Sequence, residues 1–233
     1  MIKDCIIKDF LNGMQKVYHK AKKSSLKNFD NRIVRGRARC VAVDFEDRLA
    51  DFICKNIIKE NEESLLVLTD FPVTIMPGLS NEEKKNRETR YIDIIVCREK
   101  SDEEYDILYM AELKTNTGWM RNQSETCLTK NESLIRHLKE RSTMVSSRPE
   151  SMNKSKIKVK RCVFNISPKL KYDMIVLSST NNGKNKLCEQ RKNELCRLIV
   201  LTDDSLVGKS KVEPRYSDFN DLYARIRRSI CCK

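Results

Sequence analysis

The residues best suited to chemistry gather at the end of one predicted β-strand. The stretch Tyr105–Gly118, YDILYMAELKTNTG, is strand-like as far as Met110 and then carries Glu112 and Lys114, separated by one residue. Alternate residues of a strand share a face, so the acid and the base point the same way. The simplest interpretation is an exposed ion pair, but the neighbouring strand carries a further acid that favours a chemical role.

That neighbouring strand is predicted at 89–98, where β-branched and aromatic residues surround a single acid, Asp93. The acidic turn KSDEE joins it to 105–115 as a β-hairpin, which brings Asp93 within reach of Glu112. Two carboxylates that meet repel each other and have raised pKa values unless a cation lies between them. Mg²⁺, or Mn²⁺, suits such oxygen ligands, and Lys114 beside it could orient or deprotonate a water molecule. These groups suffice for phosphodiester hydrolysis.

A further acid, Glu46, falls on a predicted helix. The segment VDFEDRLADFICKNIIKEN has apolar residues at helical spacing, among them Val43, Ala50 and Ile53, and Glu46 lies in the same row. A buried carboxylate needs compensation, so Glu46 could belong to the site. It could equally lie at the edge of the row, reaching solvent or pairing with an arginine.

The remaining pattern predicts an α/β fold, a mixed sheet flanked by helices, in one domain over 1–233. We expect a basic N-terminal helical arm at 1–42, a core at 43–204 and a C-terminal helix at 205–233. The expected elements are strands at 64–75, 89–98, 105–115, 172–180 and 196–204, helices at 43–61, about 118–144, 185–196 and 217–230, and a polar loop or mobile arm at 146–160. Ser217 is the expected N-cap of the last helix.

Glu46, Asp93, Glu112 and Lys114, in an αβββαβ order of elements, resemble the PD-(D/E)xK nuclease superfamily, the restriction endonuclease-like fold of type II restriction enzymes and many repair nucleases. The resemblance covers about 43–202. It implies that Asp93, Glu112 and Leu113 bind the metal, and that all four matched residues take part in catalysis.

Two positions depart from the family pattern. Ile92 stands where the family name has proline, a change that many members tolerate. The Gln-x-x-x-Tyr of the exonuclease-like branches is absent, because Cys127 follows Gln123 at the position of the tyrosine. The second departure favours a restriction-type or other endonuclease over an enzyme that processes DNA ends.

Charge points to nucleic acid as the partner. The formal net charge is +13, with eleven Lys and Arg against three Asp in residues 1–40, and seven Lys and Arg with no acid in 151–171. Dense basic segments suit a phosphate backbone, although a basic surface can also serve solubility. The expected DNA contacts are Arg35, Arg37, Asn116, Thr117, Arg121, Asn122, Gln123, Lys154, Lys156, Lys158, Lys160 and Arg161.

The sequence therefore predicts a Mg²⁺-dependent endonuclease acting on double-stranded DNA, of the site-specific type II restriction class and homodimeric. A structure-specific repair or junction nuclease is one alternative, and a DNA-binding protein without catalysis is another. No apolar run is long enough for a membrane span, and ten cysteines without a CxxC pair indicate reduced thiols. We expect a cytoplasmic protein.

Overall fold

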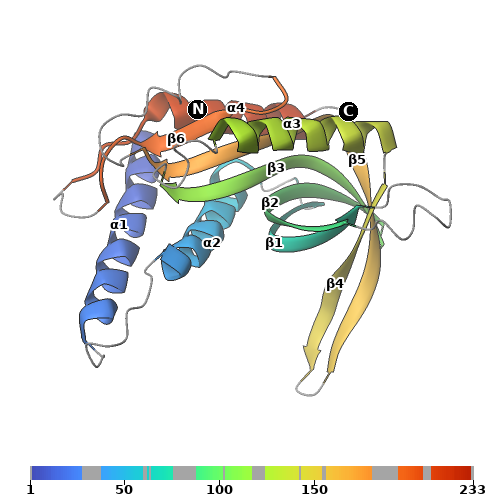
Figure 1. Cartoon of the computed structure of the whole chain (residues 1–233), viewed down its shortest axis with the longest axis horizontal. Helices are drawn as coiled ribbons and strands as arrows, with labels where there is room; N and C mark the ends of the chain where they lie inside the picture. The colour runs from blue at the N-terminus through green and yellow to red at the C-terminus, as the bar shows by residue number, and fades with distance from the viewer. Residues whose placement is uncertain are drawn as a thin grey trace.

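A computed structural model describes residues 2–27, 38–59, 62, 64–75, 88–101, 103–116, 124–141, 143–153, 156–179, 194–206 and 211–231. Its elements are α1 (Asp4–Lys27), α2 (Ala38–Asn56), β1 (Leu65–Ile75), β2 (Glu88–Ser101), β3 (Glu104–Asn116), α3 (Ser124–Arg141), β4 (Thr143–Asn153), β5 (Lys156–Ser178), β6 (Leu198–Thr202) and α4 (Tyr216–Ile230). Helices flank a mixed sheet, as Figure 1 shows, so the predicted α/β class is confirmed. The order α2, β1, β2, β3, α3 and β5 follows the expected αβββαβ, with β4 added.

The sheet holds β3 in its interior. Strands β1, β2 and β3 pair antiparallel in sequence, so the expected hairpin between 89–98 and 105–115 is confirmed. Strand β5 runs parallel to both β3 and β6 and antiparallel to β4, which also pairs with the end of β1. The pairings of β1 to β5 thus close into a ring, with β6 outside it. A side chain at the end of β3 therefore has structured neighbours from β2 and from β5.

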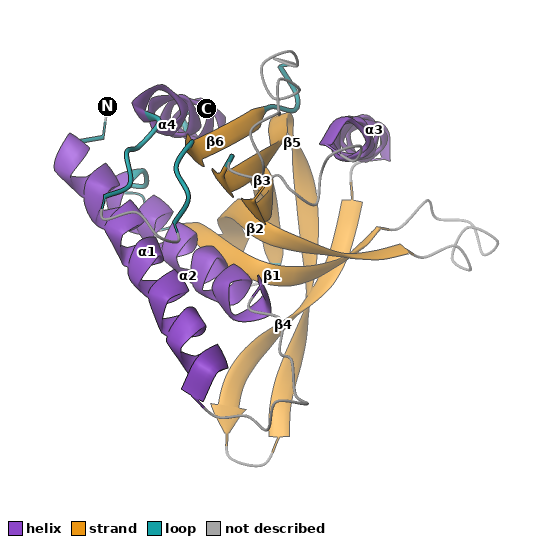
Figure 2. Ribbon diagram, turned by 60° about the vertical axis from the view of Figure 1, so that its left-hand side comes forward, coloured by secondary structure: helices purple, strands orange, loops and turns teal. Residues whose placement is uncertain are grey.

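Two hydrophobic cores cover the sheet. The first core contains the buried faces of α1, α2 and α4, which Figure 2 shows on the side of the molecule away from α3. Helix α1 contributes Ile7, Leu11 and Met14, and α2 contributes Phe45, Leu49 and Ile53, each set at helical spacing. The second core contains α3, through residues such as Leu138. The segment expected as an N-terminal arm thus has one face in the first core.

The prediction of a loop or mobile arm at 146–160 is wrong. Apart from 154 and 155, which the structure does not describe, these residues lie in β4 and β5, whose antiparallel register runs from Thr143↔Asn165 to Asn153↔Lys156. Figure 1 shows the two strands extending away from the other strands as a ribbon, here called the β4–β5 ribbon. The sequence resembles a loop because β4 is rich in serine and contains Pro149, and because only the short run KIKVK at the start of β5 alternates apolar with polar residues. The predicted helix at 185–196 lies outside the described residues except for 194–196, which are not helical.

Two predicted helix features also differ. Helix α2 begins at Ala38, before the predicted start, and Val43 is 53% exposed, so the buried row runs through Phe45 instead. Ser217 is not the N-cap of α4, because the helix begins one residue earlier with Arg215 at the cap and no side-chain capping bond. The hydroxyl of Ser217 instead donates to its neighbouring acid at 3.2 Å.

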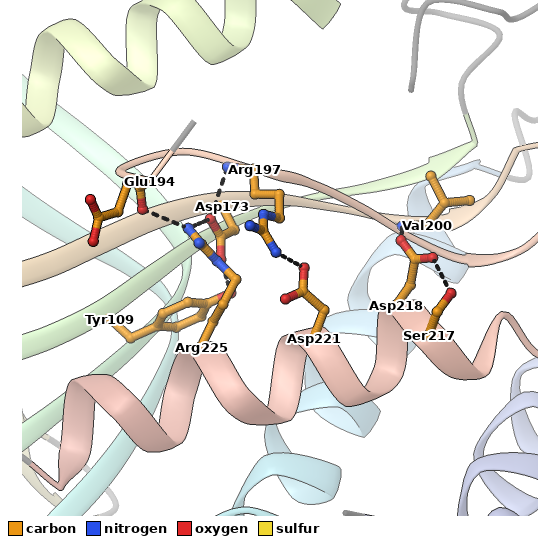
Figure 3. A network of polar contacts seen from close by, with 9 residues as sticks. All are labelled: Tyr109, Asp173, Glu194, Arg197, Val200, Ser217, Asp218, Asp221 and Arg225. Carbon is orange, nitrogen blue, oxygen red and sulfur yellow. Dashed lines mark hydrogen bonds and ion pairs between the residues drawn. The ribbon is translucent and has the colours of Figure 1, made fainter. Parts of the chain in front are cut away.

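A buried ion pair joins α4 to the sheet (Figure 3). Arg225 donates from Nε to Asp173 Oδ2 at 2.6 Å and from Nη2 to Oδ1 at 2.5 Å. The Tyr109 hydroxyl at 3.0 Å and the Arg197 backbone N–H at 2.9 Å also donate to this carboxylate. Burial raises the pKa of Asp173, and the donors around it oppose the rise. The pair fixes α4 against β5, over the first core.

None of the described helices is long and apolar enough to cross a membrane. Among the cysteines whose side chains the structure describes, Cys97, Cys162 and Cys196 are buried free thiols, and Cys5, Cys54 and Cys231 are exposed free thiols.

Candidate active site

Asp93 and the Glu112–Leu113–Lys114 motif lie side by side on β2 and β3. The described register of these strands begins with Ile94 opposite Ala111, so Asp93 and Glu112 are the next residues along each strand. One oxygen of Asp93, Oδ2, accepts a hydrogen bond from the Leu113 backbone N–H at 2.6 Å. The hairpin, which the β-branched residues of β2 favour, thereby fixes Asp93 against the motif.

The acid and the base of the motif are in contact. Lys114 Nζ lies 2.5 Å from Glu112 Oε1, and the two side chains are 34% and 27% exposed. The hydroxyl of Tyr172, on β5, donates to the other oxygen, Oε2, at 3.4 Å. Glu112 is therefore held at both oxygens while part of its surface remains open to solvent.

Negative charge is crowded at this point of the sheet. Burial and then the charge of Glu112 raise the pKa of Asp93 to about 6, although the Leu113 N–H and Lys114 oppose the rise. Burial and then the charge of Asp93 raise the pKa of Glu46, on α2, to about 7. Glu46 therefore shares the electrostatic field of Asp93, with its carboxyl half-buried. Raised pKa values that have a neighbouring charge among their causes are typical of functional sites.

A fourth acid, Asp70 on β1, was missed by the sequence analysis. The β1–β2 pairs on either side, Thr69↔Ile94 and Phe71↔Ile92, place Asp70 at the level of Asp93, and the charge of Asp70 raises the pKa of both Asp93 and Glu46. Its φ is +43°, in the left-handed region that non-glycine residues rarely adopt. The signal in the sequence was a single acid within an apolar strand, two residues before Pro72.

Both strands lose their regular alternation at this level. On β1, Leu68 packs against the second core and Phe71 lies in it, although they are three residues apart. On β2, Ile92 and Ile95 belong to the same core at the same spacing. In a regular strand every second residue points to the same face, so residues three apart should point to opposite faces. Each strand therefore contains one additional residue between the two positions named. Asp93 lies within this irregular part of β2.

The donor chemistry at the site suits a hard divalent cation. Within the described part of the chain, no three His, Cys, Asp or Glu side chains are grouped closely enough to hold a metal ion as they stand. The carboxylates of Asp93 and Glu112 nevertheless lie on neighbouring strands, the Leu113 main chain contacts Asp93, and burial followed by the charge of Glu112 raises the pKa of Asp93. Mg²⁺ typically binds one or two protein carboxylates and keeps several waters. The residues present fit such an ion.

The residues expected to bind DNA are only partly described. Strand β5 contains Lys156, Lys158, Lys160 and Arg161, all within the β4–β5 ribbon. Asn116 is the last residue of β3, and its side chain is not described. The other predicted contacts, Arg35, Arg37, Thr117, Arg121, Asn122, Gln123 and Lys154, lie outside the described residues.

Comparisons with known proteins find little. No family model matches the chain, and none of the curated proteins matches it. A solved structure of NucC from P. aeruginosa ATCC27853, in its cAAA-bound form, aligns with 96% of this chain and 90% of that chain, with a TM-score of 0.46 and 12% sequence identity. A likeness at this level does not establish membership of a family.

Proposed function

We propose that this protein is a metal-dependent endonuclease that hydrolyses phosphodiester bonds in double-stranded DNA. The observation that carries the proposal is the contact of Asp93 with the Glu112–Leu113–Lys114 motif, where the pKa of Asp93 is raised to about 6. A carboxylate with a purely structural role is normally paired with a cation, as Asp173 is with Arg225. Asp93 instead lies beside a second carboxylate, Glu112, whose charge raises its pKa in addition to burial, and this supports a site that binds a cationic ligand.

Asp93, Glu112 and the main chain at Leu113 are the groups that would hold the ion. Bound Mg²⁺ or Mn²⁺ would polarise the scissile phosphate and lower the pKa of a water molecule. Lys114 donates from Nζ and orients the attacking water, and its contact with Glu112 Oε1 keeps the ammonium group at the site. We assign Glu46 to the same catalytic group because its pKa responds first, after burial, to the charge of Asp93.

Duplex DNA is the proposed substrate because the chain carries a net charge of +13. Lys156, Lys158 and Lys160, called here the ribbon lysines, occupy alternate positions of β5 in a two-stranded ribbon. We propose that they contact phosphates, which positions the duplex without reading its sequence. The further proposed contacts are Arg35, Arg37, Asn116, Thr117, Arg121, Asn122, Gln123, Lys154 and Arg161.

We propose a site-specific, restriction-type enzyme that acts as a homodimer, because two-fold symmetry suits cleavage of both strands of a palindrome. The absence of Gln-x-x-x-Tyr after the motif supports an endonuclease over an exonuclease. Size-exclusion chromatography with light scattering tests the dimer.

Cleavage of unmodified plasmid DNA tests the activity. The purified protein is incubated with Mg²⁺ or with EDTA, beside Asp93→Asn and Lys114→Met. Lys100→Met is a matched control, because Lys100 forms an ion pair with Asp106 at 2.9 Å near the other end of the same hairpin. We expect discrete Mg²⁺-dependent fragments from the wild type and the control, and none from the other two variants.

Each other outcome has a defined meaning. Cleavage confined to branched DNA would favour the repair or junction nuclease. Salt-sensitive DNA binding that is the same in every protein, without cleavage of any of these substrates, would contradict the proposal and leave a binding protein. Cleavage that persists in Asp93→Asn would show that the active centre lies elsewhere.

A further inference from the structure

A buried tyrosine from a third strand reaches the motif. Tyr172 lies on β5 beside β3, where its register partner is Met110, and it is 3% exposed. Its backbone N–H donates to Leu195 O at 3.0 Å, and its ring belongs to the second core. Main-chain pairing and packing therefore fix the position of the ring.

The hydroxyl of Tyr172 is a hydrogen-bond donor to Glu112 Oε2, at 3.4 Å. An ionised carboxylate can only accept, so the phenol must supply the proton. Burial and the charges of Glu112 and Asp93 raise the pKa of Tyr172 well above its ordinary value, so the phenol keeps that proton. Because Lys114 Nζ holds Oε1 at 2.5 Å, the Glu112 carboxylate is fixed from two strands, one oxygen by each.

Other buried tyrosines of this fold also donate to carboxylates. Tyr105, 2% exposed, donates to Glu99 Oε1 at 3.1 Å, and Tyr109 donates to Asp173 in the network that fixes α4. The need of a buried phenol for an acceptor explains the contact of Tyr105. Among these three described tyrosines, Tyr172 is the one whose acceptor is the acid of the motif.

We propose that Tyr172 is a positioning residue of the candidate active site: its hydroxyl fixes the rotation of the Glu112 carboxylate and thereby sets the affinity of the site for its divalent cation. The inference rests on the proposed function, since it takes Glu112 as a metal ligand. Loss of a hydrogen bond to a metal-binding group typically lowers metal affinity or activity by about 10- to 100-fold.

The test compares Tyr172→Phe with Tyr105→Phe, since each removes one hydroxyl from a buried ring that donates to a glutamate. Mn²⁺ binding is measured by isothermal titration calorimetry without DNA, and the Mg²⁺ concentration for half-maximal cleavage is measured with it. Thermal unfolding of each variant reports its folding. We expect Tyr172→Phe to bind Mn²⁺ about 10- to 100-fold more weakly and to need correspondingly more Mg²⁺, with cleavage restored at saturating Mg²⁺. Tyr105→Phe should match the wild type in both assays.

Equal Mn²⁺ affinity in Tyr172→Phe and the wild type would overturn the inference. An equal loss of affinity in both variants would also overturn it, because the effect would then follow from buried phenols in general. A wild type that binds Mn²⁺ but cleaves no DNA would contradict the endonuclease, while calorimetry would still decide the role of Tyr172. A wild type that binds no Mn²⁺ would overturn both proposals.

Discussion

The metal-free protein should become more stable as the pH falls from 8 to 5. The folded-state pKa of Asp93 is about 6 and that of Glu46 is about 7, both above the ordinary values of 3.8 and 4.5. A carboxyl with a raised folded-state pKa binds its proton more tightly in the folded protein than in the unfolded chain. The resulting stability is fully present below the unfolded pKa and is lost as the pH rises through the folded pKa. For these two groups the window runs from about pH 4 to pH 8.

The pKa shift of Asp93 determines the size of the expected gain in the free energy of unfolding. A rise in pKa from 3.8 to about 6 corresponds to about 3 kcal/mol over the whole window, of which about 1.4 kcal/mol falls between pH 8 and pH 5. Glu46 is half-buried, so solvent screening reduces its contribution. The two carboxyls also interact, so their contributions do not add. We therefore expect a gain of about 1.5 to 2 kcal/mol in the free energy of unfolding between pH 8 and pH 5.

Urea unfolding in EDTA at pH 5, 6, 7 and 8 measures this gain. Asp93→Asn keeps a side-chain oxygen for the Leu113 N–H but cannot ionise, so its advantage in stability over the wild type should shrink by about 1.4 kcal/mol from pH 8 to pH 5. Asp51→Asn is the control, because Asp51 is 57% exposed and paired with Lys55. A stability difference between Asp93→Asn and the wild type that stays constant with pH, or grows on acidification, would refute the reasoning.

Three further outcomes are expected. Arg225→Met should lower the free energy of unfolding by about 3–5 kcal/mol in urea denaturation, because it leaves the buried carboxylate of Asp173 without its cation. Asp70→Asn should lower the pKa of Asp93 in the metal-free protein, followed by NMR titration of the carboxyl carbons, because one repelling charge is removed. Replacing the three ribbon lysines by glutamine should make the slope of log K against log salt for duplex binding shallower by about 2.7 in fluorescence anisotropy, if each contacts one phosphate.

The sequence predicted those elements whose apolar pattern reflects a buried face. The hairpin of β2 and β3 was predictable because β-branched residues fill both strands and a polar turn joins them. The β4–β5 ribbon was not, because its Ser- and Lys-rich sequence favoured a loop and the alternation of apolar with polar residues is confined to the short run KIKVK on one of its strands. On α2, Val43 is predicted in the buried row because it lies at helical spacing from Ala50 and Ile53, whereas the structure exposes Val43 and buries Phe45.

The residues of the candidate site also differ in whether the sequence could predict them. Asp93, Glu112 and Lys114 could be predicted because each is a charged residue in an otherwise apolar strand. The alternation of faces also places Glu112 and Lys114 on the same side of their strand. Asp70 could not be assigned from β1 alone, since its place at the level of Asp93 depends on the strand pairing and on its left-handed φ of +43°. Tyr172 could not be assigned from the sequence either. Its hydroxyl reaches Glu112 only because β3 pairs in parallel with β5, and these two strands are separated in the sequence by α3 and β4.

Asp93 and Asp173 show how one fold treats a strand acid in two ways. Asp173 receives four donated hydrogen bonds, two of them from Arg225, and this cation balances the charge that burial would otherwise make costly. Within the described residues, Asp93 accepts one backbone N–H, and Lys114, whose charge also acts on it, is in contact with Glu112. The balance of donors and charge, more than residue type, separates the structural acid from the candidate ligand. A cation supplied by the chain itself at Asp93 would stabilise the metal-free fold, and it would occupy the position that we propose for the catalytic ion.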